Sequence, residues 1–219
     1  MSILGGANGF VENQTDCLLF AFTNEGIDLD EKFENWWKEF VDIAKIPGLS
    51  EAIRVVADAD QRPGDMPAWK YMVVYGFSGN VEEIKEAINV HKMETDSELW
   101  FFEAISELVM KPWSEQDVEE HFFLALTNPV PGLEAGFRIW YDKMHLKDVV
   151  DVSVYRSGRR YLLTASNGEF DRWKYLALYR FVGTALEMHD ILFEEMNNNP
   201  NKETESLESG FGAWIYSAF

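Results

Sequence analysis

The 219-residue sequence is short of cysteine, of basic residues and of long apolar runs, and each shortage excludes a class of protein. Its one cysteine, Cys17, cannot form a disulfide within the chain. Nothing in the sequence therefore demands an oxidising compartment. Cys17 lies in the apolar run 17–23, which favours a buried side chain over a reactive thiol.

Positive charge is also scarce. Lysine and arginine together number 19 against 38 aspartates and glutamates, which gives a formal net charge of -19. A nucleic acid or an anionic membrane would be repelled by such a chain, because binding to phosphate needs basic side chains. We therefore expect neither a nucleic-acid partner nor a membrane partner.

Long hydrophobic stretches are missing as well. No segment reaches the roughly 18 apolar residues of a membrane-spanning helix. The first ten residues, MSILGGANGF, lack the basic region and the apolar stretch of a secretory signal. These features predict a soluble, cytoplasmic protein.

Several sequence motifs of known chemistry do not occur. There is no HxxxH, HExxH or CxxC, so we expect no dedicated metal site. There is also no GxGxxG, GxxxxGK or GxSxG, which disfavours ordinary nucleotide binding and a hydrolase nucleophile elbow. The sequence thus predicts neither a metal nor a bound cofactor.

Aromatic residues, in contrast, are abundant. They make up 15% of the chain, and hydrophobic residues as a whole make up 47%. This composition excludes disorder and indicates a large core, an apolar pocket or both. The expected ligand is a small hydrophobic or aromatic molecule.

One aromatic stretch occurs twice. Residues 69–77 (WKYMVVYGF) and 173–181 (WKYLALYRF) share five of nine positions at a displacement of 104 residues. At the same displacement Gly79 corresponds to Gly183, and Trp36 to Trp140. We interpret the chain as two tandem repeats, residues 1–112 and 113–219.

Each repeat reads as strand, helix, strand, strand, helix, strand. This order is the split βαβ pattern of a ferredoxin-like fold, in which the helices cover one face of an antiparallel sheet. Two bare sheet faces in one chain can pack face to face, which predicts an α+β barrel. We expect a monomer with an intrachain barrel, or a homodimer. The expected strands are 17–23, 50–57, 69–77, 99–109, 121–127, 154–164, 173–181 and 211–219, and the expected helices run from Asp28 or Asp30 to Pro47 and over 79–91, 133–149 and 184–195.

His145 is the first candidate for chemistry. It stands near the end of the expected helix 133–149, in the sequence WYDKMHLKDVV that begins at Trp140. A histidine facing a pocket could transfer a proton near neutral pH. The alternative is a solvated histidine favoured by the helix dipole. The first repeat has no matching histidine, and two residues must be gapped there to keep the following strands aligned.

The other candidates are weaker than His145, because a structural role is the commoner explanation for each of them. Tyr175 and Tyr179 share one face of a strand and could orient a substrate oxygen, or be ordinary core tyrosines. Arg160, or its neighbour Arg159, could balance an enolate or simply pair with an acid. Asn128 could donate to a ligand oxygen or close a turn. Alternation does not reveal which face of the strand 173–181 lines the barrel.

These residues carry a family resemblance. The pattern W-Y-x-x-x-H-x-x-D-V-V from Trp140, the Arg-Arg-Tyr ending at Tyr161 and the stretch from Trp173 to Tyr179 resemble the EthD-like branch of the dimeric α+β barrel superfamily. The first repeat resembles the same pattern without the histidine. The resemblance implies ligand binding between a sheet and the first helix, and a histidine matching His145 as acid or base.

The resemblance also implies a range of reactions, which includes cofactor-free isomerases, lactone-rearranging enzymes, polyketide cyclases, quinone-forming monooxygenases and haem-using relatives. We expect a cofactor-independent enzyme that transfers protons on a small aromatic, lactone or polyketide-like substrate in a barrel cavity. The alternatives are a carrier of a hydrophobic metabolite, a cofactor-free monooxygenase and a haem enzyme with His145 as axial ligand. The expected catalytic residues are His145, Arg160 and Tyr175, and the expected substrate contacts are Trp140, Tyr141, Tyr161, Trp173, Tyr179 and Asn128.

Overall fold

The computed structural model describes residues 15–23, 45–61, 67–89, 97–112, 121–168, 172–199 and 204–218. Its first half contains β1 (Cys17–Thr23), β2 (Leu49–Ala57), β3 (Tyr71–Phe77), α2 (Val81–Ile88), β4 (Glu98–Ala104) and β5 (Val109–Met110). Its second half contains β6 (His121–Thr127), α3 (Glu134–Trp140), the π-helical turn η4 (Tyr141–His145), α4 (Leu146–Asp151), β7 (Tyr155–Ser166), β8 (Tyr175–Phe181), α5 (Ala185–Asn197) and β9 (Gly212–Ala218). Most of the expected helix between Asp28 and Pro47 lies outside the described residues.

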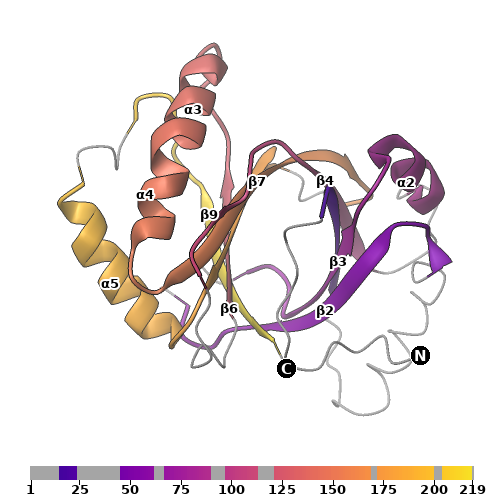
Figure 1. The fold of residues 1–219 in the computed structure, drawn as a ribbon, viewed down its shortest axis with the longest axis horizontal. Coiled ribbons are helices and arrows are strands. Elements are labelled where there is room, and N and C mark those ends of the chain that lie inside the picture. The colour runs from indigo at the N-terminus through magenta and orange to yellow at the C-terminus, as the bar shows by residue number, and fades with distance from the viewer. Residues whose placement is uncertain are drawn as a thin grey trace.

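Eight strands close into one antiparallel barrel (Figure 1). Their order is β4-β1-β3-β2-β9-β6-β8-β7, and pairing between β4 and β7 completes the ring. The short strand β5 pairs with β7 beside β4. Helices α3, α4 and α5 lie together on one side of the barrel and α2 lies on the other (Figure 1). The α+β barrel predicted from the sequence is confirmed.

The two halves of the barrel use the same strand register. Cys17 of β1 pairs with Phe77 of β3, and His121 of β6 pairs with Phe181 of β8. Both members of the second pair are displaced by 104 residues from the first, as 121 − 17 and 181 − 77 show. This register is the one that a duplication would produce, and the division into repeats at residues 112 and 113 stays a prediction.

The matched glycines explain part of the recurring pattern. Gly79 and Gly183 both have positive φ angles, 123° and 92°, which side chains other than glycine rarely adopt. Each turns the chain from a strand into a helix. Asn80 then caps α2, and Thr184 caps α5 in a capping box with Glu187. Glycine therefore recurs at this position because the backbone conformation requires it.

Large side chains fill the barrel interior. The indole rings of Trp69, Trp100, Trp173 and Trp214 contact one another with centroid distances of 5.3 to 6.3 Å. Tyr161 belongs to the same buried cluster. Such a core stabilises the fold through burial of apolar area, and it places Tyr161 and Trp173 among packing residues.

A second buried cluster lies on the outer face of the second half, beneath α3, η4, α4 and α5. It contains Phe137 and Tyr141 from the helical layer and Tyr155 and Tyr179 from the strands. On β8 the side chains of Ala177 and Tyr179 belong to this outer cluster, while those of Leu176 and Leu178 belong to the interior. The structure thereby assigns the two faces of β8, which alternation alone left open.

Gly158 lets this helical layer approach the sheet. A β-carbon added to it would lie 2.7 Å from Tyr179 Cδ1 and 2.8 Å from Val150 Cγ2. We expect Gly158→Ala to lower the free energy of unfolding by about 1–3 kcal/mol, because both neighbours are buried and must shift. Chemical denaturation measures the loss. The control is Gly136→Ala in α3, where the nearest atom would lie 3.7 Å away; equal stability of the two variants would contradict the packing described.

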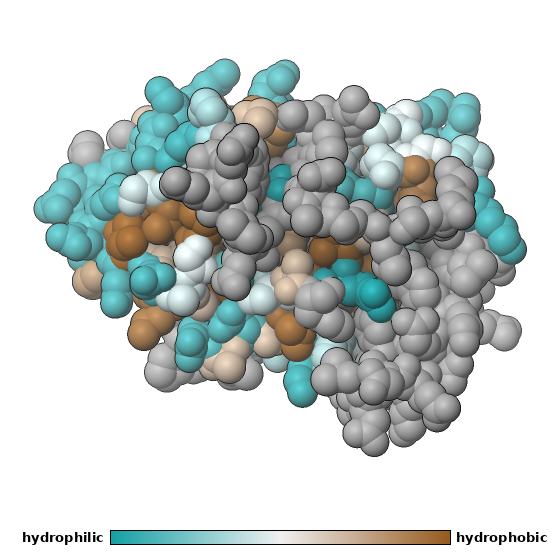
Figure 2. All heavy atoms as spheres, turned by 60° about the horizontal axis from the view of Figure 1, so that its bottom comes forward, coloured by the Kyte–Doolittle hydropathy of each residue, from teal (hydrophilic) through white to brown (hydrophobic). Residues whose placement is uncertain are grey.

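The outer surface is mainly hydrophilic among the described residues on the face shown in Figure 2, with apolar side chains in separate patches. Exposed apolar residues include Ile139 on α3 and Leu186 and Phe193 on α5. The barrel closes within one chain, as one of the two expected assemblies requires. Dimerisation stays a prediction, which light scattering at several concentrations tests. No helix in the described ranges is long and apolar enough to cross a membrane.

Candidate functional site

The candidate site lies between the outer face of β7 and β8 and the helical segment above it. Arg160 of β7 pairs with Ala177 of β8. Tyr175 and Tyr179 lie two residues before and two residues after Ala177, so they flank Arg160 on the neighbouring strand. Side chains at alternate positions share a face. Three of the residues predicted from the sequence are therefore brought together on the sheet, and Tyr141 lies above them in η4.

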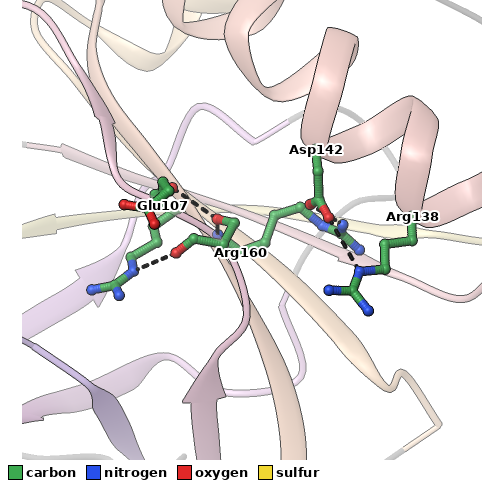
Figure 3. A network of polar contacts seen from close by, with 6 residues as sticks. Glu107, Arg138, Asp142 and Arg160 are labelled. Atoms are coloured by element: carbon green, nitrogen blue, oxygen red, sulfur yellow. Dashed lines mark hydrogen bonds and ion pairs between the residues drawn. The ribbon is translucent and has the colours of Figure 1, made fainter.

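Backbone contacts hold Arg160 in place. The loop after β4 bonds to it twice: Arg160 N donates to Ser106 Oγ over 3.0 Å, and Ile105 N donates to Arg160 O over 3.0 Å. The side chain then points toward the helix and meets Asp142 (Figure 3). The strand and the loop together fix the position of the Arg160 backbone, from which the side chain extends.

The Arg160 guanidinium is 1% exposed and surrounded by aromatic rings. Its carbon lies 4.3 Å from the ring centre of Tyr141, 5.1 Å from that of Phe137 and 5.5 Å from that of Tyr175. Nη1 donates to Asp142 Oδ1 over 2.5 Å. Nε and Nη2 are buried without a hydrogen-bond partner. Buried donors left in this way are costly, and they mark sites that bind ligands or water.

Asp142 is shared with a second arginine. Arg138 Nε lies 3.5 Å from Asp142 Oδ2 (Figure 3). The Arg138 side chain is 74% exposed, so solvent screens this pair and it contributes little. The contact with Arg160 is the stronger of the two because one partner is fully buried.

The neighbouring Arg159 has a different task. Its Nε donates to Ser106 O over 3.1 Å and its Nη1 to Thr15 O over 2.5 Å. Both bonds go to backbone carbonyls and join β7 to the segments around β1 and β4. Of the two arginines considered from the sequence, only Arg160 belongs to the aromatic cluster.

His145 packs against two aromatic rings of the same helical segment. It stacks on Trp140 at 4.2 Å with an angle of 20° and stands perpendicular to Tyr141 at 5.0 Å. Its Nδ1 atom is buried without a hydrogen-bond partner. The pKa of the imidazole is lowered from 6.5 to about 4, chiefly by burial; the negative charge of Asp148 opposes this shift and the positive charge of Arg160 adds to it. His145 is therefore neutral at physiological pH and able to accept a proton.

We expect the imidazole signals of His145 to titrate near pH 4 in NMR spectra, and those of the unfolded chain near pH 6.5. Because the pKa is lower in the folded state, the unfolded chain binds this proton first. Stability is then lost as the pH falls from 6.5 toward 4 and is constant above that window. His145→Gln should remove this component of acid destabilisation. A titration centred near 6.5 in the folded protein would contradict the buried ring.

Two tyrosines of the site are held in the neutral, donating form. Burial raises the pKa of Tyr179 well above 10, and the neighbouring Tyr141 and Tyr155 raise it further. Burial also raises the pKa of Tyr141, against the opposing effects of Tyr179 and Arg160. Tyr179 Oη is buried and interacts with the hydroxyl of Tyr141. The hydroxyl of Tyr155 donates a hydrogen bond to Met188 Sδ over 3.0 Å, which gives this tyrosine a structural role.

The remaining predicted residues fall in different places. Trp140 and Tyr141 join His145, whereas Tyr161 and Trp173 lie in the barrel interior. Trp173 precedes β8, so it does not follow the alternation that places Tyr175 and Tyr179 on one face of the strand. Asn128 accepts from Lys174 N and donates to Arg172 O, which closes the turns beside β6 and β8.

His121 takes part in a structural network at the junction of the two halves. Its Nδ1 lies 2.8 Å from Ser217 Oγ, which donates to Asp58 Oδ2 over 2.8 Å. These residues come from β6, from β9 and from the end of β2. Since the serine hydroxyl donates its hydrogen bond to the carboxylate, the histidine donates to the serine. This arrangement joins the strands.

Sequence reasoning missed Phe137, Asp142 and the π-helical turn. The turn is defined by a bond from Leu146 N to Tyr141 O, five residues back. A step of five separates the buried Tyr141 from the buried Leu146, whereas steps of three and four occur on either side of it. The buried residues of this helical segment are Phe137, Trp140, Tyr141, Leu146, Val149 and Val150. The five-residue step is a signal that the sequence contained, because a regular helix repeats every 3.6 residues. Turns of this kind are frequent at functional sites.

Within the described ranges, no group of three or more histidine, cysteine, aspartate or glutamate side chains could hold a metal ion. The chemistry available at the site is that of a neutral imidazole, a buried guanidinium and neutral phenols in apolar surroundings. These groups can bind an oxygen atom that gains negative charge and accept a proton next to it.

No family model matches the chain, and no curated protein resembles it in sequence. Its fold matches solved structures over nearly its whole length. An anthrone oxidase-like protein superposes with a TM-score of 0.58 at 10% identity, covering 95% of this chain and 92% of that one. A candidate monooxygenase from Fusobacterium nucleatum gives 0.56 at 8% identity over 94% and 93%. A mutant chlorite dismutase from Candidatus Nitrospira defluvii gives 0.51 at 7% identity over 94% and 92%. At such low identity these similarities show the fold alone.

Proposed function

We propose that the chain is a cofactor-independent enzyme that transfers a proton on a small aromatic, lactone or polyketide-like substrate. One observation carries the proposal. Three buried polar atoms without hydrogen-bond partners, His145 Nδ1 and Arg160 Nε and Nη2, belong to residues that pack around Tyr141. Buried polar groups are normally paired, so such a concentration favours a site that is completed by a ligand.

Arg160 supplies the electrostatic part of the mechanism. A carbonyl or phenol oxygen placed at its buried edge gains negative charge when the neighbouring carbon loses a proton. The fixed positive charge stabilises that oxyanion more than water would, because the surrounding rings exclude water and no reorganisation is needed. Tyr179 can donate to the same oxygen as a neutral phenol.

His145 supplies the base. The proton leaves the substrate carbon and binds an imidazole nitrogen, and the electron pair of the broken C–H bond moves to the oxygen held by Arg160. The charge of Arg160 helps to lower the pKa of His145 before reaction. Negative charge beside Arg160 offsets that effect, so the imidazole becomes more basic as the oxyanion forms. Return of the proton to another atom of the substrate completes an isomerisation.

We further propose that the chain is an EthD-like, tandemly duplicated protein. It would contain one active unit, residues 113–219, because the first repeat lacks a counterpart of His145. The equal registers of the two strand pairs support the duplication. We propose that the first repeat completes the barrel.

A haem enzyme fits the site poorly. An axial ligand needs a ring nitrogen that can approach iron freely. Trp140 stacks on one face of the His145 ring and Tyr141 stands perpendicular to it, so a porphyrin beside the ring would have to displace these side chains. We derive no step through haem.

Incubation with anthrone tests the proposed reaction. Anthrone is a planar ketone with an acidic CH₂ group, and the name of one structural neighbour suggests it. In D₂O without oxygen, the enzyme should catalyse deuterium exchange at that group, because the abstracted proton is replaced from solvent. Anthrone that is retained but recovered unlabelled would instead support a carrier and contradict proton transfer. In air, formation of anthraquinone with uptake of one O₂ and release of one water would identify the monooxygenase alternative.

A further inference from the structure

Within the described part of the protein, only one of the three nitrogen atoms of the Arg160 guanidinium group has a hydrogen-bond partner. Nη1 is bonded to Asp142, whereas Nε and Nη2 have no hydrogen-bond partner. In an arginine side chain the N–H bonds of Nε and Nη2 point the same way from one edge. The bond to Asp142 therefore does not occupy the edge formed by Nε and Nη2, which can bind two oxygen atoms at once.

The position of Asp142 is set by η4. Asp142 follows Tyr141, which faces the sheet, and in a regular helix the next residue turns about 100° away. The π-helical turn rotates less per residue, which keeps Asp142 closer to the sheet side. Its side chain is 18% exposed and reaches Arg160. The same wide turn lets His145 stack on Trp140 five residues earlier, a spacing that a regular helix places on different faces.

The rings around Arg160 restrict the ligand further. Phe137, Tyr141 and Tyr175 surround the guanidinium and hold its plane by cation–π contact. With its plane fixed, the free edge favours two oxygens that lie in one plane at a short separation. A ligand with a single oxygen would satisfy only one of the two donors and leave the other buried and unpaired, which is costly.

We infer that the site binds substrates with two neighbouring oxygens, such as the enolate of a β-diketone or a ketone with an adjacent phenol, through the Nε and Nη2 edge of Arg160. This inference deepens the proposed function and rests on it for the identity of the site. Asp142 acts as a positioning residue, because it holds Nη1 and thereby aims the free edge. The planar anion would lie against the aromatic rings, and its charge would be balanced by Arg160.

Calorimetric titration with a matched pair of ligands tests this inference. Benzoylacetone offers two oxygens, and butyrophenone has the same ring and chain length with one. We expect the wild-type protein to bind benzoylacetone at least about tenfold more tightly. Arg160→Lys keeps the charge and loses the two-donor edge, so the preference should fall to near unity. Asp142→Ala should reduce the preference, because Nη1 is no longer held and the free edge loses its fixed direction.

Any other result of these titrations would contradict the inference. Equal binding of both ligands by the wild-type protein, or binding of neither, would exclude an edge that receives two oxygens. An unchanged preference in Arg160→Lys would locate the two-oxygen contact elsewhere. Deuterium exchange on anthrone, which has one oxygen, separates the two ideas: exchange without a two-oxygen preference would retain the proposed function and remove only this inference.

Discussion

Replacing His145 by alanine is expected to lower the rate of deuterium exchange at least about a hundredfold, which is the usual contribution of a positioned general base. The imidazole is the neutral group of the site that can take up a proton, and the charge of Arg160 acts on it. Its removal leaves the oxyanion contacts in place, so substrate affinity should change little. Turnover should fall while KM stays nearly constant, as expected when an interaction of the transition state is lost.

The matched control for this variant is His121→Gln. His121 bonds to Ser217 in the network at the junction of the two halves. This substitution should cost some stability and leave the exchange rate unchanged. Free imidazole added to His145→Ala should restore part of the rate by occupying the space left by the ring. An exchange rate of His145→Ala equal to that of the wild-type protein would remove His145 from the mechanism.

Replacing Arg160 by methionine should have the other large effect, a fall of about a hundred- to a thousandfold in turnover. Methionine retains much of the length of the side chain and its apolar contact, but it cannot stabilise an oxyanion. The variant also leaves Asp142 without its buried partner. That loss should cost less stability than breaking a fully buried pair, because Asp142 is partly exposed and remains near Arg138.

Arg159→Met is the control for Arg160→Met. It removes the bonds to the carbonyl groups of Thr15 and Ser106, so it should lower stability and leave the turnover of the folded protein intact. The two neighbouring substitutions therefore have opposite expected profiles. Similar losses of turnover in both variants would mean that Arg160 acts through the fold and not on the substrate.

The sequence predicted the barrel because each strand had a local signal. The runs 17–23 and 121–127 were bounded by turn residues, and both occur as strands with the expected limits. The repeated stretch at 69–77 and 173–181 contains β3 and β8, each starting two residues later than predicted. The recurring register reflects pairing that both halves require.

Which side of β8 carried the site could not be predicted. A barrel strand covered by helices is buried on both faces, so alternation gives no contrast between polar and apolar sides. Leu176 and Leu178 face the interior, whereas Ala177 and Tyr179 face the helices. Trp173 was misplaced for the related reason that it lies just outside the strand.

Asp142 could not be predicted because its position depends on the irregular turn. A regular helix through residues 133–149 would direct it toward solvent, where it would resemble any of the other acidic residues. The five-residue step between Tyr141 and Leu146 was visible, but only the bond between Leu146 N and Tyr141 O assigns it to a π-helical turn. Contacts among segments distant in the sequence, such as Ser106 with Arg160, are likewise absent from local patterns.

The pH dependence of kcat/KM for deuterium exchange tests the central claim, proton abstraction by His145, most directly. This quantity reports the pKa of the base in the free enzyme. We predict that it rises with pH around 4, where His145 loses its proton, and then reaches a plateau. In His145→Gln the rise should disappear along with most of the activity. A rise that persists unchanged in His145→Gln, or one centred near 6.5 in the wild-type protein, would contradict the proposed mechanism.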